Sequence, residues 1–172
     1  MKEKLSMALR QIRVDGDDIL RKKCKEVKEV NERTLTLIED MLDTMYEANG
    51  VGLAAPQVGI LKRIVVIDVD YDEEESSAYI LINPVILEKD GEQCGDEGCL
   101  SIPGKVATVT RPYHVVAKYF DVDMKEQTLE AEGLLARAIC HELDHLDGVL
   151  YKDVAESPLR DVENLLEDEE EE

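Results

Sequence analysis

The stretch GLLARAICHELDHLDG, from Gly133 to Gly148, combines an apolar helical period with the metal-binding pattern His-Glu-x-x-His. Apolar side chains recur at helical spacing, and a glycine such as Gly148 is a typical residue just beyond a helix end. His141 and His145 are four residues apart, so on a helix they are offset by only about 40° and project from one face. The stretch therefore predicts a helix that presents two imidazoles to one metal ion, with Glu142 beside them.

The chain before this helix predicts one further long helix and a series of strands. Residues 31–50 carry apolar side chains at helical spacing, among them Leu35 and Met45, and end in Asn49-Gly50; residues 17–27 predict a shorter helix. Strands are expected at β-branched runs over 63–70, 79–88, 105–110, 113–121 and 128–133. The order of helix, strands and helix lacks a regular strand–helix alternation, so the expected fold class is α+β.

Size and charge narrow the classes of function. A chain of 172 residues, 44% of them hydrophobic, suits one compact domain, and we expect a single catalytic domain over 1–160 followed by an acidic C-terminal tail over 161–172. The formal net charge of −20 argues against nucleic acid or an anionic membrane as a direct partner. No apolar run approaches the roughly 20 residues that cross a bilayer, and the N-terminus lacks a secretory signal. A cytoplasmic protein without disulfides is expected.

Two imidazoles need a third ligand, and residue type and position leave several candidates. In the extended zinc-peptidase pattern, Gly148 fits but Tyr151 stands where a histidine is required. A later glutamate, Glu156 or Glu163, lies at a possible distance. His114 falls in an expected strand, where a structural or surface role is favoured. Of the acids on the helix itself, Asp144 points off the metal-binding face and Asp147 suits a supporting partner better than a ligand.

Cysteine is the other candidate. Cys99 lies in the glycine-flanked segment DEGCLSIPG, where the chain can turn a thiolate toward a site. Cys140 is adjacent to His141 and hence about 100° around the helix, which aims it badly for the same metal. Cys24 and Cys94 are expected to be structural, because free cysteine is commonly a small buried hydrophobe.

Three segments taken together resemble the peptide deformylase family. They are GVGLAAPQVG at 50–59, EGCLS at 97–101 and HELDH at 141–145, in that order, and the likeness extends over the flanking chain from about Leu9 to Leu159. The resemblance implies an α+β fold with small antiparallel sheets around the central motif-bearing helix. It also implies a metallohydrolase that removes the formyl group from the N-formyl-methionine of newly made polypeptides and releases formate, with a metal-bound water as the nucleophile.

The resemblance assigns roles to individual residues. It implies Cys99, His141 and His145 as the metal ligands, Glu142 as general acid and base, and Gln57 with the backbone N–H of Leu100 as donors to the developing oxyanion. The implied cofactor is one divalent metal ion, Fe²⁺ in the cell, with Zn²⁺, Ni²⁺ or Co²⁺ possible in a purified sample. The implied partners are N-formyl-methionyl nascent peptides, with transient proximity to the ribosome.

A methionine side chain requires an apolar pocket. The expected walls are Val51, Leu134 and Ala138, and Gly52 is expected to let the backbone approach the substrate. Arg137 is on the same side of the helix with a role that the sequence leaves open, and Arg111 is expected to pair with Glu97 and so hold the Cys99 segment.

Two rival functions stay open from the residues alone. One is an endopeptidase that uses a downstream acid in place of Cys99. The other is a non-catalytic binding module in which Cys94, Cys99, Cys140 and the histidines form a closed structural metal site.

Overall fold

The computed structural model describes residues 8–70 and 77–163, and these form two antiparallel sheets with three helices. The five-stranded sheet has the order β1-β2-β3-β6-β7 and the three-stranded sheet the order β4-β5-β8. The strands are β1 Gly52–Ala54, β2 Ile64–Ile67, β3 Tyr79–Asp90, β4 Gln93–Cys99, β5 Ile102–Arg111, β6 His114–Phe120, β7 Glu126–Glu132 and β8 Arg160–Asp161. The helices are α1 Glu32–Glu47, α2 Gly133–Leu146 and α3 Tyr151–Val154, with single 3-10 turns η1 Asp18–Arg21 and η2 Ala55–Val58.

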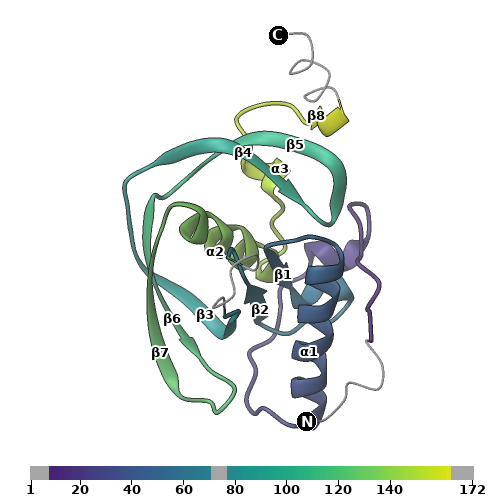
Figure 1. The fold of residues 1–172 in the computed structure, drawn as a ribbon, viewed down its shortest axis with the longest axis vertical. Coiled ribbons are helices and arrows are strands. Elements are labelled where there is room, and N and C mark those ends of the chain that lie inside the picture. The colour runs from purple at the N-terminus through teal and green to yellow at the C-terminus, as the bar shows by residue number, and fades with distance from the viewer. Residues whose placement is uncertain (1–7, 71–76, 164–172) are drawn as a thin grey trace.

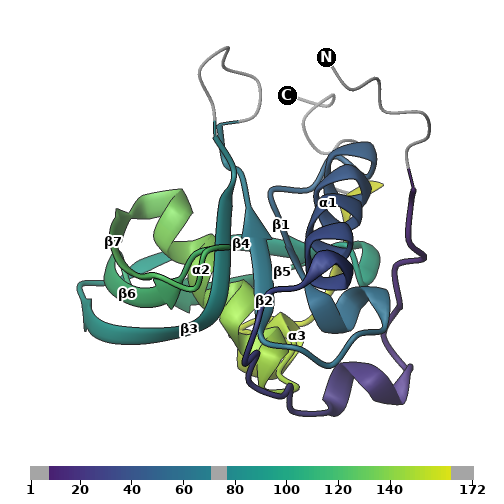
Figure 2. The same ribbon diagram turned by 90° about the horizontal axis from the view of Figure 1, so that it is seen from below.

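Helix α2 occupies the middle of the molecule. In Figure 1 the strands β3, β6 and β7 lie on one side of it, α1 and β1 on the other, and the β4–β5 hairpin arches over it. The view from below in Figure 2 shows the same arrangement, with α2 between the β6–β7 edge and α1. The expected α+β class and the central position of the motif-bearing helix are both confirmed.

The core explains why α2 is apolar on more than one side. Its buried residues Ile139, Leu143 and Leu146 belong to the same cluster as Val65 and Leu81 of the five-stranded sheet. A second cluster joins α1 to the opposite face of β2, where Ile64 and Val66 alternate with the residues that face α2. The sheet is therefore covered by α2 on one face and by α1 on the other, and α2 is fixed from several directions.

Helix α1 follows the prediction for residues 31–50 at both ends. Asn31 caps its first turn by accepting a hydrogen bond from Thr34 N, and Asn49 adopts a left-handed conformation, φ 56°, just after its end. The helical spacing predicts that Leu35 lies on the buried apolar face, but in the structure Leu35 is 43% exposed and Leu37 is buried instead.

The shorter helix expected over 17–27 is wrong beyond its first turn. Only Asp18–Arg21 is helical, because the backbone that follows bonds to distant partners. Cys24 N donates to Leu146 O at 2.8 Å, and Lys25 N donates to Leu61 O at 3.0 Å. These bonds fix the N-terminal segment against the end of α2, and they satisfy groups that a continued helix would have used internally.

Gly148 marks the end of α2, as expected, and two features require a glycine there. Its φ is +76°, and a Cβ at this position would lie 2.5 Å from the backbone oxygen of Arg21. The helix therefore ends where the N-terminal segment crosses it.

The C-terminal end of the described chain is built into the smaller sheet. Arg160 pairs with Val106 and Asp161 with Lys105 in an antiparallel register. The expected boundary between the domain and the acidic tail, at residue 161, thus falls within strand β8. Residues 164–172 of that tail lie outside the described residues.

Candidate metal centre

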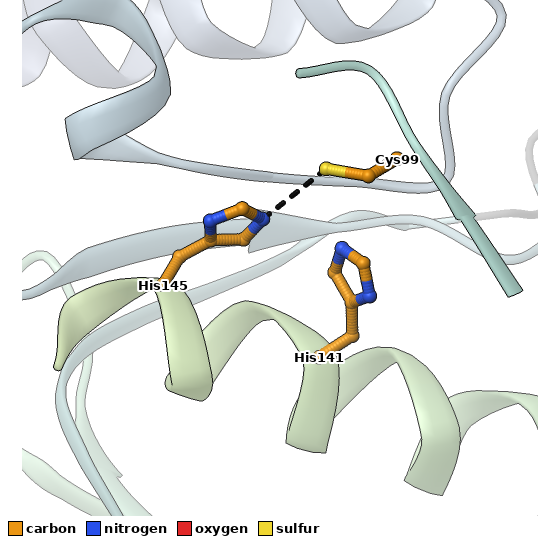
Figure 3. Close-up of side chains that lie close together, drawn as sticks. All are labelled: Cys99, His141 and His145. Carbon is orange, nitrogen blue, oxygen red and sulfur yellow. Dashed lines mark hydrogen bonds between the residues drawn. The ribbon is translucent and has the colours of Figure 1, made fainter. Parts of the chain in front are cut away.

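Three side chains converge where the β4–β5 hairpin passes over α2. Cys99, at the end of β4, brings its Sγ to 3.3 Å from Nε2 of His145, and the ligand atoms of Cys99, His141 and His145 all lie within 4.8 Å of one another. Figure 3 shows both imidazoles rising from α2 toward the cysteine that comes from the strand above. Among residues 8–70 and 77–163, no other group of three or more His, Cys, Asp or Glu side chains lies close enough together to share a metal ion.

His141 is held in position by Glu97, two residues before the cysteine. Its Nδ1 lies 2.5 Å from Glu97 Oε1, which leaves Nε2 turned toward the site. A carboxylate that accepts from the far ring nitrogen fixes the orientation and tautomer of a ligating histidine. Sequence reasoning placed Glu97 only opposite Arg111 and missed this contact; the position of Glu97 on the cysteine's own strand was the available signal.

Glu97 is the centre of a buried ion network. Arg111 donates to both of its carboxylate oxygens, at 2.7 and 3.1 Å, and Arg137 donates to Oε2 at 2.8 Å. Arg111 also reaches Asp144 at 2.7 Å. Burial alone would raise the pKa of Glu97, but the hydrogen bonds from His141 and Arg111 lower it to about 2. The expected pair of Arg111 with Glu97 is present in the structure, and Arg137 belongs to the same network while also lining the cavity.

Glu142 lies beside the three converging side chains and is 4% exposed. Its Oε1 is 3.8 Å from Nε2 of His141, and its Oε2 has no hydrogen-bond partner within the described part of the chain. Burial raises the pKa of Glu142 to about 7. A carboxyl group with this pKa exchanges protons readily near neutral pH, as a general acid and base requires.

Gly52 has a role that the sequence did not indicate, besides the approach to substrate expected of it. A Cβ at this position would lie 2.7 Å from Oε1 and 2.9 Å from Cγ of Glu142. The absence of a side chain at Gly52 therefore makes room for the buried carboxylate, in addition to forming part of the cavity wall.

The second imidazole, that of His145, is uncharged because it is buried. His145 is 1% exposed, and burial lowers its pKa well below the usual value. Its Nδ1 has no hydrogen-bond partner among residues 8–70 and 77–163.

Asp147, expected as a supporting partner of the site, instead accepts from Arg63 at 3.0 Å, so that prediction was wrong. Asp147 follows the end of α2, where its side chain reaches the surface and a surface arginine.

Gln57 and Ser101 border the site from the other side. The Gln57 Oε1 accepts from Ala54 N at 2.9 Å, and its Nε2 donates to Ser101 Oγ at 3.0 Å and to Cys99 Sγ at 3.5 Å. The side chain is 1% exposed and belongs to the 3-10 turn η2. Leu100 follows the cysteine and lines the same cavity. Sequence reasoning did not single out Ser101, which holds the amide of Gln57 in place.

A cavity of about 520 Å³ opens directly onto these groups. The three expected wall residues, Val51, Leu134 and Ala138, line it, as does Gly52, although Leu134 is 54% exposed and therefore stands at its mouth. Cavities of this volume are typical of sites for small molecules and short peptide segments.

The other candidate ligands lie outside this cluster. His114 contacts Glu130 on the neighbouring strand β7, and both Glu156 and Glu163 are exposed. All four cysteines are free. Burial raises the pKa values of Cys140 and Cys24, the latter to about 11, which keeps both as thiols. Cys94 is exposed, in contrast to the buried position expected of a structural cysteine.

The donor set fits a divalent metal ion. It combines one sulfur and two imidazole nitrogens, and three protein ligands of this kind leave a coordination position open, as in catalytic sites. Beside these side chains, the Oε2 of buried Glu142 has no partner among the described residues, as expected where a polar ligand binds. An α+β fold in which a His-Glu-x-x-His helix and a strand cysteine enclose such a site defines a metallohydrolase.

Comparison with known proteins narrows this class to one family. The profile of the family described as polypeptide deformylase matches residues 9–161. A curated peptide deformylase of Agathobacter rectalis is 63% identical over 156 residues, which are 91% of this chain and 96% of the relative. Among solved structures, a peptide deformylase from Legionella pneumophila has a TM-score of 0.83 at 44% identity and covers 88% of each chain. One from Synechococcus elongatus in complex with actinonin has a TM-score of 0.84 at 44% identity, covering 89% of this chain and 83% of that one.

The chain belongs to the polypeptide deformylase family, whose members are metal-dependent hydrolases that remove the N-terminal formyl group from newly made polypeptides. The family, fold and activity implied by the three motifs are thereby confirmed. Among residues 8–70 and 77–163, no helix is long and apolar enough to cross a membrane.

Proposed function

We propose that Cys99, His141 and His145 hold one divalent metal ion and that Glu142 carries the proton in hydrolysis of the formyl amide. The observation that carries this proposal is the convergence of the three ligand atoms within 4.8 Å, next to a buried carboxylate with an unpartnered oxygen. When bound, the ion supplies Lewis-acid chemistry, which activates water and polarises a carbonyl group.

Glu142 performs both proton transfers in this scheme. As a carboxylate it accepts a proton from the attacking water, and as a carboxylic acid it returns that proton to the nitrogen of the leaving amine. Burial raises the pKa of Glu142 above that of an ordinary glutamate, which favours its return of the proton to the amine. The products are formate and a free N-terminus, so atoms and charge balance over the reaction.

Gln57 and Leu100 are proposed to stabilise the charge on the formyl oxygen. The Gln57 amide is fixed through Ala54 and Ser101, and the N–H that makes the longer 3.5 Å contact with Cys99 Sγ is the one proposed to turn to an oxygen bound beside the thiolate. The backbone N–H of Leu100 is the second proposed donor, because this residue follows Cys99 directly and lines the cavity. Donors fixed before the reaction cost no reorganisation, and losing one typically raises the barrier by about 3–4 kcal/mol.

The cavity is proposed to receive the methionine side chain. Val51, Leu134 and Ala138 offer apolar surface to a thioether, and Gly52 lies between this surface and the carboxylate of Glu142. The chain that follows methionine then leaves through the open mouth of the cavity.

Ferrous iron is proposed as the metal in the cell, as the resemblance to the family implies. The donor set itself accepts several divalent ions, so selection depends on supply. A thiolate ligand makes such a site sensitive to oxidation. The cytoplasm, with transient approach to the ribosome, is the proposed setting, since that is where formylated chains emerge. Metal analysis of protein purified with and without oxygen tests the metal: iron should predominate only in the anaerobic sample.

The assay that tests the proposed function is formate release from formyl-Met-Ala by anaerobically purified protein. Wild-type protein should release formate, whereas Glu142→Gln should retain the metal and lose turnover by several orders of magnitude. Cys99→Ala should lose the metal, which separates this function from an endopeptidase with a downstream acid as its third ligand. Formate release that survives Glu142→Gln would contradict the proposed mechanism, and absence of release by metal-loaded wild-type protein would overturn the function.

A further inference from the structure

The chain directly after strand β8 reaches the wall of the cavity, outside all three sequence motifs. The segment before it is anchored on β5, where Glu156 N donates to Thr108 O at 2.8 Å and Thr108 N donates to Ser157 Oγ at 2.9 Å. Val162, the residue directly after β8, lines the same cavity as Cys99 and Glu142. The C-terminal segment thus adds a wall to the substrate site.

Both members of β8 neutralise a charged residue of the cavity wall. Asp96 and Lys105 line the cavity, and each would present a charge to a bound peptide. Arg160 forms an ion pair with Asp96, and Asp161 forms one with Lys105. The four side chains are between 38% and 51% exposed, so both pairs remain in contact with solvent. With β8 in place, this wall offers paired charges and the apolar side chain of Val162.

The position of β8 sets which part of the substrate it meets. In the sheet order β4-β5-β8, two steps of about 4.8 Å separate β8 from β4, the strand that ends in Cys99. Cys99 pairs with Ile102, whereas β8 pairs with Lys105 and Val106, so an offset of about 10 Å along β5 adds to this separation. A total of about 15 Å corresponds to roughly four to five residues of extended chain. A peptide whose formyl group lies at Cys99 and Glu142 would therefore reach β8 with residues beyond the methionine.

We propose that β8 is a specificity element that makes the enzyme indifferent to charge in the residues following formyl-methionine. This proposal rests on the proposed deformylase function and extends it to the downstream part of the substrate. Releasing either wall charge from its partner should create a preference of predictable sign, because unlike charges attract the peptide and like charges repel it.

Two single substitutions should shift the preference in opposite directions. Asp161→Asn leaves the Lys105 cation unpaired and should favour formyl-Met-Ala-Glu-Glu over formyl-Met-Ala-Lys-Lys. Arg160→Gln leaves the Asp96 carboxylate unpaired and should favour the lysine peptide. The readout is the ratio of kcat/KM for the two peptides, expected to move about two- to fivefold from the wild-type ratio, mainly through KM. Raising the salt to about 0.5 M should remove most of the shift.

Matched controls separate this role from general effects of charge. Glu126→Gln and Lys118→Gln change the net charge equally but belong to an exposed pair between β7 and β6, and both should leave the ratio unchanged. Val162→Lys adds a cation to the wall without touching either pair, so it should act in the same direction as Asp161→Asn. It tests whether this wall meets the downstream residues of the peptide even if Arg160→Gln fails to fold.

The outcomes distinguish failure of the β8 proposal from failure of the deformylase function. Opposite shifts for Asp161→Asn and Arg160→Gln, absent from the controls, support the proposal. Ratios equal to the wild-type value in Asp161→Asn and Val162→Lys would overturn it while leaving the deformylase function intact. If wild-type enzyme released no formate from any peptide, the proposed function would fail and this proposal with it.

Discussion

Charged side chains form two contrasting groups in this molecule. The inner network of Glu97, Arg111, Arg137 and Asp144 lies behind His141, and its first three side chains are only 5–11% exposed. The outer pairs, His114–Glu130 and Lys118–Glu126, lie across β6 and β7, and their acidic members are 72% and 59% exposed. The residue types are similar, but water competes for the outer pairs and is nearly excluded from the inner network.

This difference in exposure should decide how much each group contributes. Exposed pairs are worth little, because solvent and salt screen them. Breaking a buried pair is costly, because the remaining charge has lost its water and its partner. The inner network also fixes His141, a proposed metal ligand, so its loss should reach the chemistry of the site, whereas loss of an outer pair should not.

Replacing Glu97 should have the largest effect. Glu97→Ala leaves Arg137 without its carboxylate, Arg111 with Asp144 alone and the Nδ1 of His141 without an acceptor. We expect a loss of about 3–5 kcal/mol in the free energy of unfolding and a fall of about 10- to 100-fold in metal affinity. Denaturant titration and metal competition measure the two losses. Glu130→Ala on the outer surface is the control; equal losses in both variants would break the comparison.

Arg111→Ala should rank next. Glu97 keeps its contacts with Arg137 and His141, and Asp144, at 33% exposure, can turn to solvent. We expect a loss in unfolding free energy of about 3 kcal/mol, at the lower end for buried pairs, and weaker metal retention during dialysis against a chelator. Unchanged metal retention would show that the arginine does not hold the Cys99 segment.

Gly52→Ala should disturb the site without removing a charge. The added Cβ falls 2.7 Å from Oε1 of Glu142, so the carboxylate or β1 must move. Overpacking of this kind costs about 1–3 kcal/mol, and kcat should fall more than the metal content does. Gly95→Ala is a matched control, because a Cβ there meets only Arg137 Nη2 at an ordinary 3.5 Å. An active Gly52→Ala enzyme with wild-type kcat would show that Glu142 tolerates displacement.

Lys118→Gln should have only a small effect. The pair with Glu126 spans 3.5 Å with both side chains well exposed, so we expect a change below about 1 kcal/mol. Thermal unfolding at low and high salt measures it. A larger loss that persists in high salt would mean that exposure is a poor guide to the value of an ion pair here.

The pH response of His114 should be the smallest effect. Its hydrogen bond with Glu130 raises the pKa of His114 above 6.5. The resulting stabilisation is fully present below pH 6.5, and it is lost as the pH rises through the raised pKa. Glu130→Gln should lower this pKa because it removes the largest cause of the rise, while the charges of Asp90 and Glu132 should keep part of it. An NMR titration of the imidazole provides the measurement, and a pKa that does not fall would contradict the assignment.

Local patterns predicted the parts of the molecule that depend on neighbours in sequence. The helical period of 133–148 and the four-residue spacing of the histidines determine α2 and its metal-binding face, and the β-branched runs predicted β2 and β3. The roles of Glu97 and Gly52 could not be found this way, because both depend on contacts with α2 that are distant in sequence. Glu97 contacts His141, 44 residues later, and Gly52 contacts Glu142, which follows it by the difference between their numbers, 142 − 52 = 90. Spacing alone also left Cys99 as one candidate among several, until the three motifs were taken together.

The bond from Cys24 N to Leu146 O bears on how the chain assembles during synthesis. The strands made first bury Val65 and Leu81 against α2, a helix that is completed only at Leu146. Until then these strands lack their packing partner, and a fold that depends on such long-range contacts forms more slowly than a helical bundle. The protein that processes new chains at their N-termini must itself be synthesised as far as Leu146 before Cys24 can form its bond to the end of α2.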